Sequence, residues 1–244
     1  MWEPQLALAE RGWRVIAPFL RGFGSSSSVP TTADASHAMS ADATQTTIDD
    51  YAGDIVDLLD TLRIPEAVIG GVSMGGYVAF ALFRRAARYF RGMVLADTRA
   101  SADTPEGIEG RKRMLQLVRD KGPQGVADDM IPKLVGETTR RSRPDVVDLV
   151  RRLVLENSAD AIAGAIHALM TRPDSTPLLA GIDCPTLVIV GDEDTVTPRP
   201  AAEELQRGIA RSELVVVPGA GHLSSLEQPD AFNEALAGFL DHRI

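Results

Sequence analysis

Three side chains of the sequence could together perform nucleophilic chemistry: Ser73, Asp194 and His222. A serine hydroxyl is a poor nucleophile at neutral pH, so it needs a base to take its proton and a third group to hold and stabilise that base. A histidine can act as the base and a carboxylate as the third group. Ser73 gives the most specific signal, because it lies in the Gly-x-Ser-x-Gly pattern of residues 71–75.

The Gly-x-Ser-x-Gly pattern stands between a predicted strand and a predicted helix, which is the setting that gives it meaning. The apolar run 67–69 predicts a buried strand, and the unbroken run 77–82 predicts a buried helix. A sharp turn between them would hold Ser73 in a strained conformation, with glycines on both sides leaving room for the helix to approach the strand. The hydroxyl would then stand at a helix N-terminus, where backbone N–H groups favour a developing negative charge. This setting disfavours the alternative of a glycine-rich turn that only joins two elements.

Asp194 and His222 also follow apolar runs that predict strands, so all three side chains stand at carboxyl ends of predicted strands. In open α/β sheets, sites form at that edge. The predicted strands alternate with predicted helices and are apolar throughout, which indicates a mostly parallel sheet with helices on both faces. The predicted strands are 13–18, 67–69, 92–97, 185–190 and 214–217, and the predicted helices are 2–11, 48–62, 77–90, 199–210 and 229–242.

Strand signals vanish between about residue 100 and residue 179. We expect residues 100–179 to form a helical cap or lid, and residues 1–99 and 180–244 to form the α/β core. His167 falls in the last helix of this insertion and is expected to be a packing residue. The polar stretch 25–46, which contains His37, is expected to be a solvated connection. The helices predicted in the insertion are 105–121, 124–135, 144–156 and 159–171.

Composition excludes several classes of function. The net charge of −9, from 25 basic and 34 acidic residues, disfavours nucleic acid or an anionic membrane as a partner. We find no apolar stretch near the ~20 residues of a membrane span and no signal-peptide pattern. Cys184 is the only cysteine and is expected to be a buried structural thiol, which favours a cytoplasmic location. The four histidines are scattered, so no metal site is expected.

With these motifs in place, the sequence resembles the α/β-hydrolase superfamily, in its small bacterial esterase and enol-lactonase-like branch. The order serine, acid, histidine along the chain is the order of that family. The resemblance implies Ser73 as the nucleophile, Asp194 as the acid, His222 as the base and the Met74 backbone N–H as one oxyanion donor. It implies no cofactor. The matching segments are residues 14–18, 21–25, 71–76, 185–194 and 219–222.

Several carboxylates compete with Asp194 for the role of the acid. Asp192 and Glu193 are its neighbours and are expected to be loop or capping residues. The family pattern places the acid three residues after the glycine that ends the strand, which selects Asp194. Asp97, at the end of the preceding strand, is the position that some family members use instead. Glu227, after His222, is expected to be a surface or capping residue.

The sequence departs from the family in two places. Phe19 stands where the family usually has an aspartate, at the rim of the site. In addition, the family has a strand ending in a His-Gly loop before the helix that residues 2–11 resemble, and this loop supplies the second oxyanion N–H. The absent strand would lie between strand 13–18 and the serine strand. We expect the sequence to be a fragment, although the sheet could instead close differently or a second chain could fill the gap.

The sequence therefore predicts a serine hydrolase that cleaves small carboxylic esters or lactones through an acyl-enzyme on Ser73. A cofactor-free haloperoxidase or perhydrolase, or a C–C bond hydrolase, would use the same three residues. From another class, a non-catalytic binding protein or an inactive fragment stays open, because loss of one oxyanion donor typically costs ~100- to 1,000-fold in rate. The expected partner is a small ester or lactone, and the sequence leaves open a homo-oligomer.

Overall fold

The computed structural model describes residues 1–26 and 46–244. The sheet that it contains has four strands in the order β1-β2-β3-β4, and each neighbouring pair is parallel. The expected parallel α/β architecture is confirmed. Most of the polar connection, including His37, lies outside the described residues. The strands are β1 (Ala67–Val72), β2 (Phe90–Ala96), β3 (Thr186–Gly191) and β4 (Ser212–Val217).

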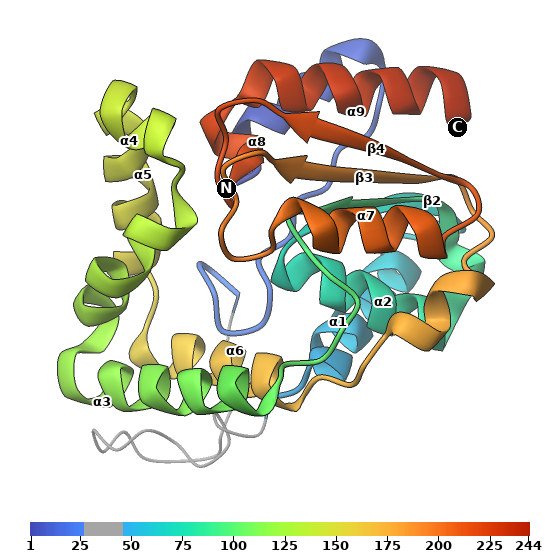
Figure 1. The fold of residues 1–244 in the computed structure, drawn as a ribbon. Helices are drawn as coiled ribbons and strands as arrows, with labels where there is room; N and C mark the ends of the chain where they lie inside the picture. The colour runs from blue at the N-terminus through green and yellow to red at the C-terminus, as the bar shows by residue number, and fades with distance from the viewer. Residues whose placement is uncertain (27–45) are drawn as a thin grey trace.

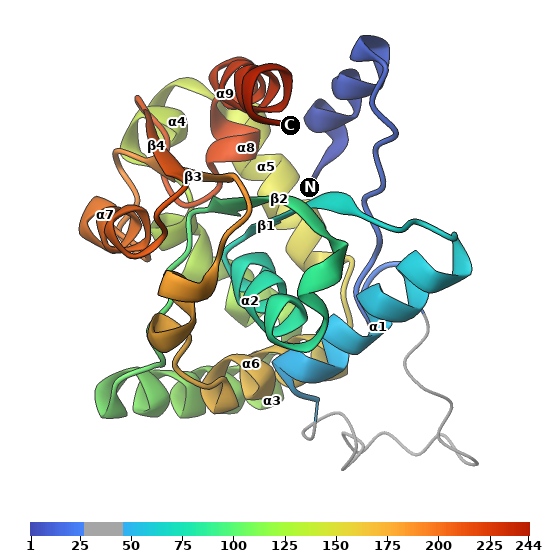
Figure 2. The ribbon, with the colours of Figure 1, turned by 90° about the vertical axis from the view of Figure 1, so that its right-hand side faces the viewer.

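Helices cover both faces of the sheet (Figures 1 and 2). They are η1 (Glu3–Arg11), α1 (Ile48–Thr61), α2 (Met74–Ala86), η3 (Ala87–Tyr89), η4 (Thr176–Gly181), α7 (Arg199–Gly208), α8 (Ser224–Glu227) and α9 (Pro229–Arg243). Alternate side chains of β2 show the two layers: Met93 and Leu95 pack in the cluster with α2 and α7, whereas Val94 and Ala96 pack in the cluster with α9. The strands are therefore apolar on both faces, as their sequences predict.

The helix α1 begins where the sequence predicts it. Thr47 and Asp50 form a reciprocal capping box: the Asp50 N–H donates to Thr47 Oγ1 over 3.2 Å, and the Thr47 N–H donates to Asp50 Oδ2 over 2.8 Å. Ile48 and Tyr51 of the apolar face are buried against α2. This packing supports α2, the helix that follows Ser73.

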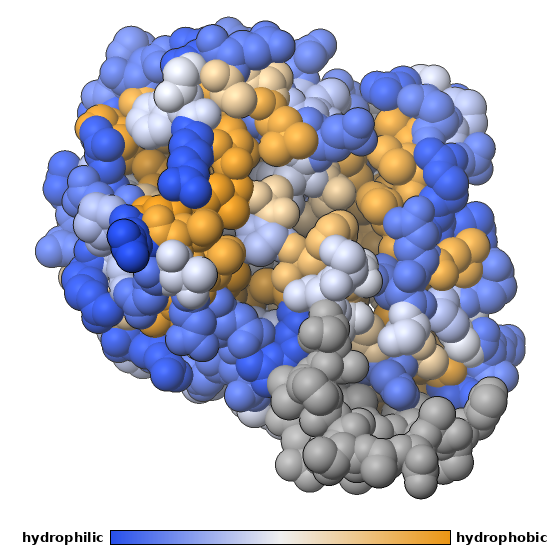
Figure 3. Space-filling view, turned by 180° about the vertical axis from the view of Figure 1, so that it is seen from behind, coloured by the Kyte–Doolittle hydropathy of each residue, from blue (hydrophilic) through white to orange (hydrophobic). Residues whose placement is uncertain are grey.

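Besides η4, four α-helices stand between β2 and β3 in the chain, and these four lie beyond the carboxyl ends of the strands (Figure 1). They are α3 (Pro105–Leu134), α4 (Glu137–Ser142), α5 (Pro144–Leu155) and α6 (Ala159–Thr171). The two helices expected at 105–121 and 124–135 form one element with a break at Gly122, which has φ of 60° and precedes Pro123. From behind, Figure 3 shows a hollow between the part that holds the sheet and the part built from α3–α5, with apolar residues inside it. Among the described residues, no helix combines the length and the apolar character that crossing a membrane requires.

The prediction of a strand at residues 13–18 is wrong. Within residues 1–26 and 46–244, that segment pairs with no strand, and it passes β1 without pairing (Figure 2). Its apolar residues Trp13 and Val15 instead pack against the α9 side of the core. In the described residues β1 is therefore an edge strand. Residues 13–18 do not pair with it across the place of the strand that the family has there. The helix expected at residues 2–11 forms as the 3-10 helix η1, and Gly12, with φ of 88°, follows its last residue.

Candidate active site

Ser73 lies between β1 and α2 in a strained backbone conformation, with φ of 79° and ψ of −102°. Two contacts from β2 and the residues after it hold this turn. The Ser73 N–H donates to Ala96 O over 3.0 Å, and the Thr98 hydroxyl donates to Ser73 O over 2.8 Å. The Met74 N–H is the first of α2, and the first N–H groups of a helix have no partner within it.

Glycine is required at position 71 by the approach of α2 to β1. A Cβ on Gly71 would lie 2.1 Å from the carbonyl carbon of Gly75. A Cβ on Gly76 would lie 2.5 Å from Thr98 Oγ1. A Cβ on Gly75 itself would meet nothing within 4 Å. The sequence predicts that glycines leave space for the helix to approach the strand. The structure needs that space at Gly71, beside the backbone of Gly75, and at Gly76, beside Thr98.

The three candidate residues lie in a hydrogen-bonded line. His222 Nε2 lies 2.8 Å from Ser73 Oγ, and His222 Nδ1 lies 2.9 Å from Asp194 Oδ2. Both His222 and Asp194 are buried, whereas Ser73 is partly exposed. Because an ionised carboxylate only accepts hydrogen bonds, Nδ1 carries the imidazole proton and Nε2 can accept the proton of Ser73. The arrangement can therefore pass a proton from the serine to the histidine.

Asp194 is held as an ionised group. Its Oδ1 accepts the backbone N–H groups of Val196 and Thr197 over 2.8 and 3.0 Å, and its Oδ2 accepts the Thr197 hydroxyl over 2.7 Å. Burial alone would raise the pKa of Asp194, but the hydrogen bond and charge of His222 and the bonds from Thr197 outweigh it, so the pKa lies below its usual value. A carboxylate that stays charged can stabilise an imidazolium beside it.

The other carboxylates near Asp194 have different partners. Asp192 accepts the Gly219 N–H over 2.7 Å, and Glu193 accepts the Thr138 N–H over 2.8 Å. Asp97 bonds to the loop after His222 rather than to the imidazole ring. Of the candidates for the acid, Asp194 alone bonds to His222 in the described residues.

The backbone at His222 and Leu223 is held by one acceptor from a distant part of the chain and one from the next helix, α8. The His222 N–H donates to Leu134 O over 3.0 Å, and the Leu223 N–H donates to Glu227 Oε1 over 3.1 Å. The sequence prediction of a surface position for Glu227 is wrong, because its side chain is fully buried beneath the start of α4. The capping alternative holds, since Leu223 is the residue before α8. The reason for the burial is the 2.8 Å bond that Glu227 accepts from the Gly136 N–H.

Other residues considered from the sequence lie outside this line. Phe19 is 62% exposed, and its ring lies against Gly24 in the loop before residue 27. His167 Nδ1 lies 3.0 Å from Thr46 O, where α6 meets the start of α1. Cys184 is buried, and burial raises the pKa of its thiol.

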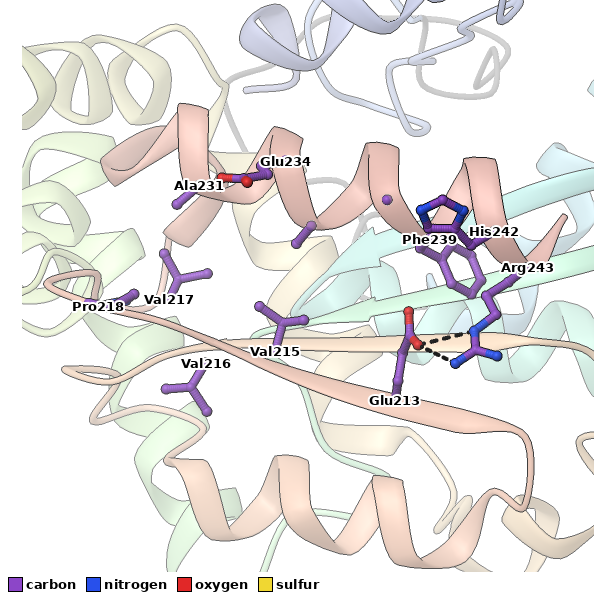
Figure 4. Close-up of a pocket in the computed structure, with 12 residues that line it drawn as sticks. Glu213, Val215, Val216, Val217, Pro218, Ala231, Glu234, Phe239, His242 and Arg243 are labelled. Carbon is purple, nitrogen blue, oxygen red and sulfur yellow. Dashed lines mark hydrogen bonds and ion pairs between the residues drawn. The ribbon is translucent and has the colours of Figure 1, made fainter.

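A groove of about 450 Å³ runs between β4 and α9 (Figure 4). Val215 of the strand and Phe239 of the helix line it, and Glu213 pairs with Arg243 on one side. Ser73 and His222 do not line this groove. It is therefore separate from the candidate active site.

A nucleophilic serine on a strained strand-to-helix turn, with an acid and a histidine at neighbouring strand ends, is the arrangement that α/β hydrolases share. Comparison with known families agrees with this geometry. The chain matches the alpha/beta hydrolase fold family over residues 1–229 and belongs to it. The resemblance inferred from the sequence is confirmed, and it places the chain in a family of hydrolases.

Individual relatives include lactonases and esterases. The chain is 30% identical to 3-oxoadipate enol-lactonase 2 of Acinetobacter baylyi, over 97% of this chain and 82% of the relative. Among solved structures, a thermophilic esterase from Thermogutta terrifontis is 39% identical, with a TM-score of 0.88 over 98% of this chain and 84% of that one. The enol-lactonase from Burkholderia xenovorans is 29% identical, with a TM-score of 0.84 over 99% of this chain and 86% of that one.

Proposed function

We propose that the chain is a serine hydrolase that cleaves small carboxylic esters or lactones through an acyl-enzyme on Ser73. The observation that carries the proposal is the line of contacts from Ser73 Oγ to His222 Nε2 at 2.8 Å and from His222 Nδ1 to Asp194 at 2.9 Å. The esterase and enol-lactonase activities in the names of its relatives support the substrate class. We propose no cofactor for this chemistry.

In the first half of the proposed reaction, Ser73 Oγ attacks the carbonyl carbon of the substrate while His222 Nε2 takes the hydroxyl proton. The carbonyl oxygen becomes an oxyanion, to which the Met74 N–H at the start of α2 donates. The bond between the carbonyl carbon and the alcohol oxygen then breaks, and His222 returns the proton to that oxygen. Asp194 keeps the imidazole oriented and stabilises its charged form.

In the second half, water attacks the acyl carbon and gives its proton to His222. The bond from the acyl carbon to Ser73 Oγ breaks, the serine recovers the proton, and the carboxylic acid leaves. For a lactone the released alcohol stays attached to the acyl group, so the product is a hydroxy acid, or its keto form when the lactone is an enol ester. At the end of each turnover Ser73 and His222 have returned to their starting protonation states.

The test is hydrolysis of p-nitrophenyl acetate and butyrate by the purified chain beside Ser73→Ala. We expect the serine variant to lose about 10³-fold or more in kcat while its thermal unfolding transition stays close to that of wild type. Hydrolysis that Ser73→Ala retains in full would contradict the proposal. A folded wild-type chain without turnover would also contradict it and would favour a binding protein.

A further inference from the structure

Asp97 is a buried carboxyl group that the proposed mechanism does not use. It follows β2, has no exposed surface, and adopts a φ of 46°, which is uncommon for a residue other than glycine. Its own N–H donates to Ile189 O of β3 over 2.9 Å. A charged side chain in such a place requires several hydrogen bonds, since burial of a carboxylate is otherwise costly.

Those hydrogen bonds come from the two loops that carry the acid and the base. Asp97 Oδ1 accepts the N–H of Gly191, the last residue of β3 and three positions before Asp194. Asp97 Oδ2 accepts both the N–H and the hydroxyl of Ser224, over 3.2 and 2.5 Å. Ser224 is two positions after His222. One carboxylate thus fixes the backbone near both partners of the proton relay.

The next residue along the chain holds the nucleophile. The Thr98 hydroxyl donates to Ser73 O over 2.8 Å, and its side chain fills the space beside Gly76 in the first turn of α2. Asp97 and Thr98 are adjacent, so a shift of this dipeptide would move the serine turn and the histidine loop relative to each other. The distance from Ser73 Oγ to His222 Nε2 depends on how the serine turn and the histidine loop are placed relative to each other.

The charged groups that act on Asp97 are His222 and Asp194. Burial raises the pKa of Asp97 to about 7, and the charge of His222 and the bonds from Ser224 and Gly191 oppose that rise. The same attraction acts in reverse on the imidazolium that forms when His222 takes the serine proton. Where Asp97 is charged, near and above pH 7, it therefore favours the protonated base.

We propose that Asp97 is a positioning residue that acts through His222: it holds the histidine loop at the distance needed for proton transfer from Ser73 and adds negative charge beside the imidazolium. This inference rests on the proposed function and deepens it. It assigns to Asp97 a role distinct from that of the acid, which belongs to Asp194.

The experiment compares wild type with Asp97→Asn, which keeps the shape of the side chain and removes its charge. We expect kcat to fall by about 10- to 100-fold, because small misplacements of reacting groups have costs of that size. KM should stay within about 2-fold. The acid limb of the kcat/KM profile should move to lower pH, because near pH 7, where Asp97 of wild type becomes charged, the variant has no negative charge beside the imidazolium.

Asp103→Asn is the matched control. Its side chain is 3% exposed, and its bonds go to Arg172, Arg111 and Arg99 rather than to the histidine loop. We expect this variant to be less stable than wild type, with the acid limb of its kcat/KM profile at the same pH as that of wild type. Ser224→Ala is the second variant: it removes one hydroxyl bond to Asp97 and should lower kcat less than Asp97→Asn, without moving the limb.

An acid limb that Asp97→Asn leaves unmoved would overturn the proposal, whatever happens to kcat. If Asp97→Asn does not fold, a kcat of Ser224→Ala equal to that of wild type would overturn it as well. The proposed function fails by a different result, namely hydrolysis that does not depend on Ser73. The two failures are thus distinguishable in one set of assays.

Discussion

Glu227 Oε2 accepts the backbone N–H of Gly136 over 2.8 Å, although 91 positions separate the two residues. The other oxygen of the same carboxylate accepts the N–H of Leu223, the neighbour of His222. One buried side chain thus connects the loop of the candidate base to the turn between α3 and α4. The His222 N–H, which donates to Leu134 O, makes a second connection at the same place.

Glu227→Gln should destabilise the fold, because the new amide NH₂ would face one of the two N–H groups and leave it without an acceptor. We expect a loss of about 1–3 kcal/mol in the free energy of unfolding, measured with urea. Glu203→Gln is the control: Glu203 pairs on the surface with Arg199 and Arg207, so the change should stay within about 0.5 kcal/mol. Equal stabilities of the two variants would show that the buried bonds contribute nothing measurable.

Gly71→Ala and Gly75→Ala should have opposite effects on stability, although both glycines belong to the same motif. A methyl group on Gly71 would lie 2.1 Å from the backbone of Gly75, so the turn must open and stability should fall by about 3 kcal/mol or more. A methyl group on Gly75 meets nothing within 4 Å, and alanine is favoured in a helix by about 0.5–1 kcal/mol. Thermal unfolding of both variants tests this, and a Gly71→Ala variant as stable as wild type would contradict the geometry.

Asp194→Asn should leave the fold intact and lower kcat for p-nitrophenyl esters by about 10³- to 10⁴-fold. The amide cannot keep the proton on His222 Nδ1, so Nε2 no longer reliably accepts from Ser73. Asp192→Asn, on the same loop but bonded to Gly219, is the comparison and should keep most of the activity. If the two variants were equally active, Asp194 would not be the acid.

The sequence predicts the parallel sheet and the strand-end positions of Ser73, Asp194 and His222, because apolar runs and glycine-containing turns are local signals. It does not predict that residues 13–18 lack a strand partner, since an apolar pattern is satisfied equally by packing of Trp13 against the core. The burial of Glu227 has no local signal either, because its acceptor role depends on Gly136.

Asp97 shows the same limit within the site. Its place after a strand makes it a candidate for the acid, and the sequence alone leaves that alternative open. Only the arrangement of the loops shows that its oxygens face Ser224 and Gly191, while Asp194 faces the imidazole. The choice depends on distances between segments far apart in the chain, which residue types at strand ends do not determine.

Asp97 should also give the stability of the fold a distinctive pH dependence. Its pKa is raised from 3.8 to about 7 by burial, so between these values the folded chain binds a proton that the unfolded chain releases. Stability from this group is therefore fully present below about pH 4 and is lost as the pH rises to about 7. Relative to wild type, Asp97→Asn should gain on the order of 4 kcal/mol in unfolding free energy across that range.

Asp103 should show the opposite sign and serves as the internal comparison. Burial raises its pKa, but Arg172 and Arg111 outweigh that effect, so the pKa lies below its usual value. Its contribution to stability is present above the pKa of the unfolded chain and is lost as the pH falls. The free energy of unfolding of Asp103→Asn should therefore decrease relative to that of wild type as the pH rises through about 4. Urea unfolding of both variants between pH 3.5 and about 8 measures the two slopes. Slopes of the same sign would mean that Asp97 is not held in the buried, proton-binding environment from which its role was inferred.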